Sequence, residues 1–283
     1  MNETFDMASW RKKWENPELF TPEKREEKYE VLRELLKYEL KWLESLRANC
    51  AFPEREGFDS RIVQRLAKTQ HKLLNLLVKI GVPGLFPFVA VPIAGRDEVL
   101  TTFKMVMSLS RPGERLEPAL NFEQVFDVKQ GKPRSKRFSH FMINVNEGRL
   151  TDGFSPKDVI AQIEAAKFFC PDLGQTIAYI KHSDLLRHPF CVYACGSRYR
   201  DNKLVPVICN DQGNRTLTWG EIDKARAGSV CPSYQMSLKA SSLEGFFSLK
   251  AYIRLGAWER IRRGFFTYRK PLHTETENDV DIV

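Results

Sequence analysis

Two long amphipathic segments in the first third of the chain constrain its fold most. In residues 21–50, apolar side chains recur every three or four positions, at Tyr29, Leu32, Leu36, Leu40, Leu43 and Leu46. Residues 59–81 repeat the pattern with Ile62, Leu66, Leu73, Leu77 and Ile80. This spacing predicts two helices, each with one apolar stripe, because 3.6 residues per turn bring such positions to one face. Pro53 and Gly57 interrupt the pattern between them, so we expect an antiparallel helical hairpin.

The expected ends of these helices follow from capping chemistry. Thr21 and Pro22 are typical of a helix start, because a threonine side chain caps and proline fits the first turn. Gly81 stands where a left-handed residue ends a helix, and Pro83 blocks continuation. We interpret residues 1–20 as an ill-ordered lead-in.

The pattern changes after Gly84. Apolar runs at 86–93, 138–145, 190–194 and 204–209 predict strands, and the polar connection 196–203 predicts a hairpin between the last two. Prolines place the strand at 86–93 at a sheet edge or a bend. Helices are expected from the capping residue Ser155 and over 173–186. We therefore predict an α+β fold: an N-terminal helical hairpin (1–81) packed on a mixed α/β domain (82–242), then a basic C-terminal helix (243–270) and an acidic disordered tail (271–283).

Hydropathy and cysteine content narrow the cellular setting. The chain has no run of about 18 apolar residues, so no membrane-spanning helix is expected. Its first residues are acidic and lack the basic and apolar regions of a secretory signal. Six cysteines are sparse for 283 residues. We expect a cytoplasmic protein whose thiols are reduced.

The cysteines suggest chemistry only weakly. Four of them follow one another at loose spacings: Cys191, Cys195, Cys209 and Cys231. Zinc sites prefer close pairs such as Cys-x2-Cys, and adding His182 and His188 gives enough ligands but no known spacing. A nucleophilic Cys195 needs a neighbouring base or a helix N-terminus, and no helix begins at Gly196. Burial in the core is favoured, and we predict no metal, cofactor or catalytic residue.

A polar turn at residues 196–201 is the first candidate surface. It holds Ser197, Arg198, Arg200 and Asp201 between two predicted strands. Arg198 would clamp an anionic ligand through its guanidinium, with backbone N–H groups of the turn assisting. The structural alternative, which we favour, is that Arg198 or Arg200 pairs with Asp201 and caps the turn, because charged hairpin turns are common.

Residues 246–270 are the second candidate surface. They contain seven Lys or Arg against one Glu, a net charge of +6, together with seven aromatic residues. The cations proposed to contact nucleic acid are Lys250, Arg254, Arg262, Arg263 and Arg269. Such a helix fits phosphates and stacked bases, or an anionic membrane surface. It fits equally a core-docked helix with a solvated basic face.

Several short blocks resemble a known family. They are residues 141–148 (Phe-Met-Ile-Asn-Val-Asn-Glu-Gly), 154–156 (Phe-Ser-Pro), 196–198 (Gly-Ser-Arg), Asp201, 205–206 (Val-Pro) and 217–219 (Leu-Thr-Trp). Together they resemble an uncharacterised bacterial domain of unknown function, seen mostly in actinobacteria, over about residues 81–240. Members of that family carry more tryptophan around the last block. The resemblance implies no activity, since none is established for the family.

The leading functional hypothesis is a non-enzymatic binding protein that contacts nucleic acid or another anionic surface through residues 246–270, with residues 132–137 assisting. One alternative is an enzyme or anionic-ligand binder at the turn, in which Arg198 holds the anion and Asp201 or His182 moves protons. Another is an accessory factor that binds a protein partner through an apolar stripe of the hairpin.

Overall fold

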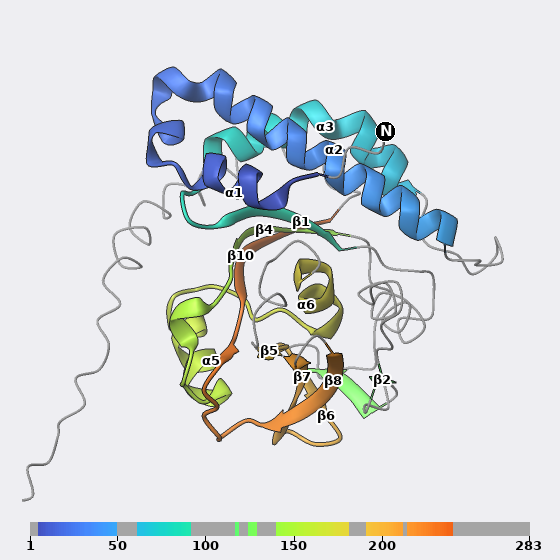
Figure 1. Cartoon of the computed structure of the whole chain (residues 1–283), viewed down its shortest axis with the longest axis vertical. Coiled ribbons are helices and arrows are strands. Elements are labelled where there is room, and N and C mark those ends of the chain that lie inside the picture. The colour runs from blue at the N-terminus through green and yellow to red at the C-terminus, as the bar shows by residue number, and fades with distance from the viewer. Residues whose placement is uncertain are drawn as a thin grey trace, which may run out of the picture. The chain divides into compact units, whose positions relative to one another are not determined.

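The computed structural model describes residues 5–49, 61–91, 117–118, 124–128, 140–180, 191–211 and 214–239. All of these lie in one compact unit that covers residues 1–246. The predicted basic helix, the acidic tail and the loop at 132–137 lie outside the described residues. The predicted class is confirmed, because N-terminal helices are combined with mixed sheets in an α+β arrangement (Figure 1).

After an all-helical start, the described elements fall into a group of strands, a group of helices and a second group of strands. The helices are α1 (Met7–Glu15), η1 (Pro17–Phe20), η2 (Pro22–Lys24), α2 (Arg25–Asn49), α3 (Arg61–Ile80), η4 (Arg149–Thr151), α5 (Pro156–Ala165) and α6 (Leu173–Ile180). The strands are β1 (Phe86–Val91), β2 (Glu117–Pro118), β3 (Val125–Asp127), β4 (His140–Asn146), β5 (Cys191–Tyr193), β6 (Ser197–Tyr199), β7 (Leu204–Asp211), β8 (Asn214–Glu221), β9 (Ser229–Val230) and β10 (Ser233–Lys239). None of the described helices is both long and apolar enough to span a membrane.

Helices α2 and α3 form the predicted antiparallel hairpin. Lys28, near the start of α2, donates from Nζ to the carbonyl of Gly81 just after α3, at 3.2 Å. The hydroxyl of the next residue, Tyr29, lies 2.8 Å from Nδ1 of His71 in α3. The apolar stripes are buried, as Leu36 and Leu73 illustrate at 1% and 0% exposure. Burial of these stripes against each other and the sheet supplies the main free-energy gain of this layer.

The prediction of an ill-ordered N-terminus is wrong for residues 5–20. Asp6 caps α1, since its carboxylate accepts from the backbone N–H groups of Ala8 and Ser9. Trp10 and Trp14 lie one helical turn apart and are each only 2% exposed. They are among the largest fully buried side chains of the described residues, and their burial fixes α1 on the fold.

The helix end at Gly81 also differs from its prediction. Gly84, and not Gly81, has the left-handed backbone, with φ +77°. Gly81 instead lies against the ring of Trp14, where an added Cβ would be 2.8 Å from the indole. The glycine is therefore required for close approach of α1 to the end of α3, and not for a left-handed cap.

A three-stranded antiparallel sheet in the order β1-β4-β10 lies beneath the helical layer, and α6 lies on its other side (Figure 1). Strand β1 is an edge strand, as its prolines predicted, and all six of its residues are buried. The carboxylate of Glu39 in α2 accepts from the backbone N–H of Ala90 at 3.5 Å. Helix α2 thus covers the open edge of this sheet.

A partly buried ion pair joins α1 to the end of β4. Arg11 pairs with one carboxylate oxygen of Glu147, and Arg149 Nε donates to the other at 2.6 Å. Burial alone would raise the pKa of Glu147, but the two guanidiniums outweigh it and lower that pKa. The carboxylate therefore stays ionised and holds the N-terminal helix to the sheet.

The second sheet has the order β2-β8-β7-β5-β9. The predicted hairpin is confirmed, because β5 and β7 pair antiparallel with Cys191 opposite Cys209 and Tyr193 opposite Val207. The connection between them contains an unpredicted strand, β6, which pairs antiparallel with β3. This pairing directs the turn at residues 196–201 toward a distant part of the chain.

Candidate functional site

The turn between β5 and β7 separates its four candidate residues into an inner and an outer pair. Gly196 begins the turn and lies against residue 170, where an added Cβ would be 2.6 Å from the backbone oxygen of Cys170. Strand β6 then runs with Phe126 opposite Arg198. Ser197 and Arg198 are buried, whereas Arg200 and Asp201 are exposed.

The inner pair fastens the turn to the core. Ser197 is fully buried, and its Oγ accepts from the backbone N–H of Leu173 at the start of α6, at 2.9 Å. Arg198 is 6% exposed, and its Nη1 donates to the carbonyls of Cys195 and Ser197 at 2.9 and 2.8 Å. Burial lowers the pKa of this guanidinium. The hydrogen bonds of Arg198 therefore stabilise the turn from within.

Asp201 closes the outer end of the turn. Its Oδ1 accepts from the backbone N–H groups of Lys203 and Leu204, at 2.8 and 3.1 Å. These bonds start β7, as an aspartate does in an Asx turn. The structural alternative predicted that Arg198 or Arg200 would pair with Asp201 and cap the turn. In the structure, the hydrogen bonds that cap the turn at Asp201 come instead from backbone N–H groups.

Arg200 is held outward by an uncommon backbone conformation. Its φ is +59°, a region that non-glycine residues seldom occupy. The backbone N–H of Arg200 donates to the carbonyl of Gln124, and its Nε donates to Gln124 Oε1, both at 2.9 Å. Backbone strain that is maintained by specific contacts is a mark of functional sites.

The guanidinium of Arg200 lies against two aromatic rings. Its central carbon is 5.0 Å from the centroid of Tyr199 and 5.8 Å from that of Trp219. The two rings stack with centroids 5.3 Å apart and planes inclined by 29°. Tyr199 is 1% exposed and forms the floor, while Trp219 is 38% exposed and faces solvent. We call Gln124, Tyr199, Arg200 and Trp219 the Arg200 platform.

Sequence reasoning identified only one member of this platform, Arg200, as a candidate site residue. Trp219 stands opposite Pro206 in the β7–β8 pair, and Gln124 precedes the short strand β3. Their contact with Arg200 depends on the β7–β8 and β3–β6 pairings, and the hydrogen bond between Gln124 and Arg200 joins residues 76 positions apart. The tryptophan at position 219 was the available signal, but nothing in the sequence places it beside Arg200.

The other candidate residues cannot be compared with this geometry. Lys250, Arg254, Arg262, Arg263 and Arg269 lie outside the described residues, as do His182 and His188. For residues 246–270, only the sequence bears on function, and it has a net charge of +6.

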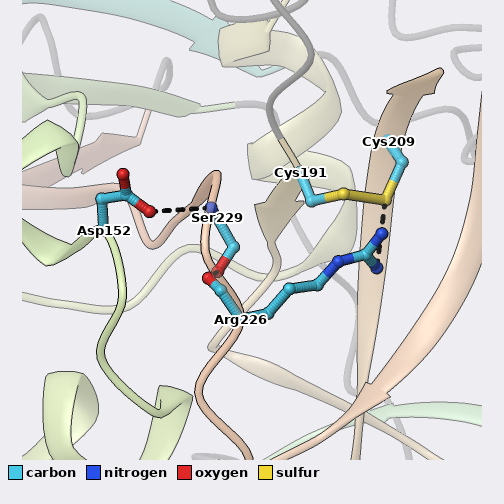
Figure 2. Close-up of a disulfide and its surroundings, with 5 residues drawn as sticks. All are labelled: Asp152, Cys191, Cys209, Arg226 and Ser229. Carbon is cyan, nitrogen blue, oxygen red and sulfur yellow. Dashed lines mark hydrogen bonds between the residues drawn. A yellow bond between two sulfur atoms is a disulfide. The ribbon is translucent and has the colours of Figure 1, made fainter.

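Reduced thiols were predicted, and this is wrong for two cysteines. Cys191 and Cys209 are joined by a disulfide across β5 and β7, with their Cα atoms 4.1 Å apart (Figure 2). The pairing register explains the bond, because directly opposite residues of antiparallel strands approach most closely where no ladder hydrogen bonds join them. A disulfide also removes these two sulfurs as zinc ligands. Among the described residues, no group of three or more His, Cys, Asp or Glu is placed to hold a metal.

The three described thiols outside the bridge are poorly suited to nucleophilic chemistry. Cys170, Cys195 and Cys231 are all buried. A hydrogen bond with Cys231 and burial raise the pKa of Cys195 well above its ordinary value. The Cys195 thiol is therefore protonated at neutral pH, and a protonated thiol is not the nucleophilic form.

Comparison with known proteins adds no relative. No family model matches the chain, and no curated protein or solved structure does so at a significant level. The resemblance to an uncharacterised bacterial domain over residues 81–240 therefore stays a prediction.

Proposed function

We propose that this chain is a non-enzymatic binding protein whose ligand is single-stranded nucleic acid. The observation that carries the proposal is the Arg200 platform, in which a solvent-facing indole is fixed on a buried ring beside a positioned guanidinium. Residues 246–270 would supply the phosphate-binding charge.

The platform has the chemistry that unstacked bases recognise. A base stacks on an exposed tryptophan and on the flat face of an arginine, in both cases without sequence readout. Tyr199 and Gln124 hold Trp219 and Arg200 in place before a ligand arrives, so little conformational entropy is lost on binding. Duplex DNA keeps its bases stacked inside, and we therefore expect it to bind more weakly than a single strand.

The sequence of residues 246–270 supports the electrostatic part of the proposal. Lys and Arg near a phosphate backbone release condensed counterions, and the release drives binding at low salt. A net charge of +6 over 25 residues is concentrated enough for several phosphates. Its seven aromatic residues would add further stacking surfaces.

Two competing hypotheses have less support. A catalytic or anion-binding turn needs its side chains to converge, yet Ser197 and Arg198 face the core while Arg200 and Asp201 face solvent. A protein partner on the helical hairpin needs an exposed apolar stripe. Among the described residues, the exposed large apolar side chains are Val128, Leu150, Phe169 and Trp219, none of which belongs to the hairpin.

The test is direct binding at several salt concentrations. The full chain is titrated into a fluorescein-labelled single strand, and anisotropy is read between 50 and 200 mM salt. If the five named cations each neutralise one phosphate, log K should fall against log salt with a slope of about −3 to −4. An absent or salt-insensitive interaction contradicts the proposal. So does binding to anionic lipid vesicles without binding to the oligonucleotide.

A further inference from the structure

The Cys191–Cys209 disulfide carries a charged neighbour that a purely structural bridge does not need. Both cysteines are 6% exposed, so the bridge lies just under the surface. The Nη1 of Arg226 donates toward Sγ of Cys209 at 3.8 Å (Figure 2). Arg226 itself is exposed, and its side chain reaches inward from the loop that precedes β9. The guanidinium thus contacts one of the two sulfurs and not both equally.

The loop that holds Arg226 is fixed from two sides. Asp152 accepts through Oδ1 from the backbone N–H groups of Gly228 and Ser229, at 2.7 and 3.2 Å. Ser229 Oγ in turn donates to the carbonyl of Arg226. On the other side, the backbone N–H of Cys191 donates to the carbonyl of Gly228 at 2.8 Å. Asp152 thus holds the loop through backbone donors, and the guanidinium of Arg226 points toward the disulfide.

We propose that Cys191–Cys209 is an exchange-active disulfide, in which Arg226 stabilises Cys209 as the departing thiolate. A thiolate of a low-molecular-weight thiol such as glutathione attacks Sγ of Cys191. The S–S bond breaks, its electron pair goes to Sγ of Cys209, and a mixed disulfide forms at Cys191. A second thiolate attacks the outer sulfur of that mixed disulfide and releases Cys191. Two small thiols are thereby oxidised to one small disulfide, and Cys191 and Cys209 each gain a proton.

The asymmetry of the site decides which sulfur leaves. Exchange is faster when the leaving thiol has a lower pKa, and a neighbouring guanidinium lowers the pKa of a thiol by favouring its anion. Arginine stays charged at every physiological pH, so its effect does not depend on its own titration. Cys195 and Cys231 are already free thiols, so a reductant does not act on them. Reduction of the bridge should therefore yield two new thiols, those of Cys191 and Cys209.

The test measures how fast reduced glutathione opens the bridge in the full chain. Samples are quenched with an alkylating agent, and the modified cysteines are counted by mass spectrometry. Arg226→Ala should slow the opening by about threefold or more. Arg226→Lys should retain most of the rate, because it keeps a cation at the position. Lys224→Ala is the matched control, since Lys224 is an exposed cation two residues away that pairs with Glu221, and it should react like the parent.

A second measurement needs no variant. Trapped early in the reaction, the parent chain should carry the glutathione adduct on Cys191. An adduct mainly on Cys209, or equal rates in the parent and Arg226→Ala, overturns the proposal. The result does not depend on nucleic-acid binding, so the two proposals fail or succeed separately.

Discussion

The indole N–H of Trp10 donates to the backbone carbonyl of Val31 at 2.8 Å, a buried hydrogen bond between α1 and α2. The ring of Trp14 lies parallel to that of Trp10, with centroids 6.0 Å apart. Trp14 also donates from Nε1 to the carbonyl of Leu85, at the start of the sheet. The N-terminal segment is therefore part of the core and joins both layers.

Trp14→Ala should strongly destabilise the fold. The substitution leaves a cavity among Phe20, Lys28 and Gly81 and leaves the carbonyl of Leu85 without its donor, so we expect a loss of about 3–5 kcal/mol. Urea denaturation followed by circular dichroism measures it. Trp219→Ala is the control, because a 38% exposed indole should contribute about 1 kcal/mol or less. A loss in Trp14→Ala as small as that expected for Trp219→Ala would show that α1 is not part of the core.

Lys28 should make stability depend on pH. Burial lowers the pKa of this lysine to about 8, whereas in the unfolded chain it is near the ordinary value of 10.5. Between these values the unfolded chain binds more protons, so the contribution of Lys28 to stability rises with pH. Relative to Lys28→Met, the free energy of unfolding of the parent should rise by about 1–2 kcal/mol between about pH 7.5 and about pH 9.5.

The comparison with Lys28→Met is essential, since other groups titrate in the same range. Burial raises the pKa of Tyr38 and of Tyr193, so the contribution of each tyrosine to stability falls at high pH. These contributions are common to the two proteins and cancel in the difference. A difference in unfolding free energy that stays constant with pH, or that falls, would rule out the buried ammonium as its source.

The disulfide should contribute measurably to stability. Cys191 and Cys209 are 18 residues apart, and closing a loop of that length restricts the unfolded chain by about 3 kcal/mol. A Cys191→Ser/Cys209→Ser variant should lose about that much in chemical denaturation under oxidising conditions. Added reductant should destabilise the parent and leave the variant unchanged. Reductant effects of equal size in both proteins would contradict this assignment.

Much of the fold was predictable because the pattern that encodes it is local. The apolar stripes of α2 and α3 repeat over several turns. The cap at Ser155 involves a residue only three positions away, because Ser155 Oγ accepts from the backbone N–H of Asp158 at 3.2 Å. The short helix α1 was missed because two tryptophans over nine residues give too few turns to establish a period.

The candidate site was less predictable because it depends on long-range pairing. The turn at 196–201 was found from its composition, but its division into inward Arg198 and outward Arg200 follows from the β3–β6 pairing. The same holds for the cysteines. Their spacing was compatible with zinc, a nucleophile or the core, and only the register of β5 on β7 places Cys191 opposite Cys209.

The central claim is that the protein binds a single strand in two ways at once: a base stacks on the Arg200 platform, and the cations of residues 246–270 neutralise phosphates. The decisive measurement compares anisotropy titrations of Trp219→Ala and of an Arg254→Ala/Arg262→Ala/Arg263→Ala variant against the parent, with one labelled single strand at several salt concentrations. Trp219→Ala should weaken binding by about tenfold with the salt slope unchanged, and the triple variant should reduce the slope by about 2. Parent-like affinity of Trp219→Ala, with the fold intact, would contradict the account.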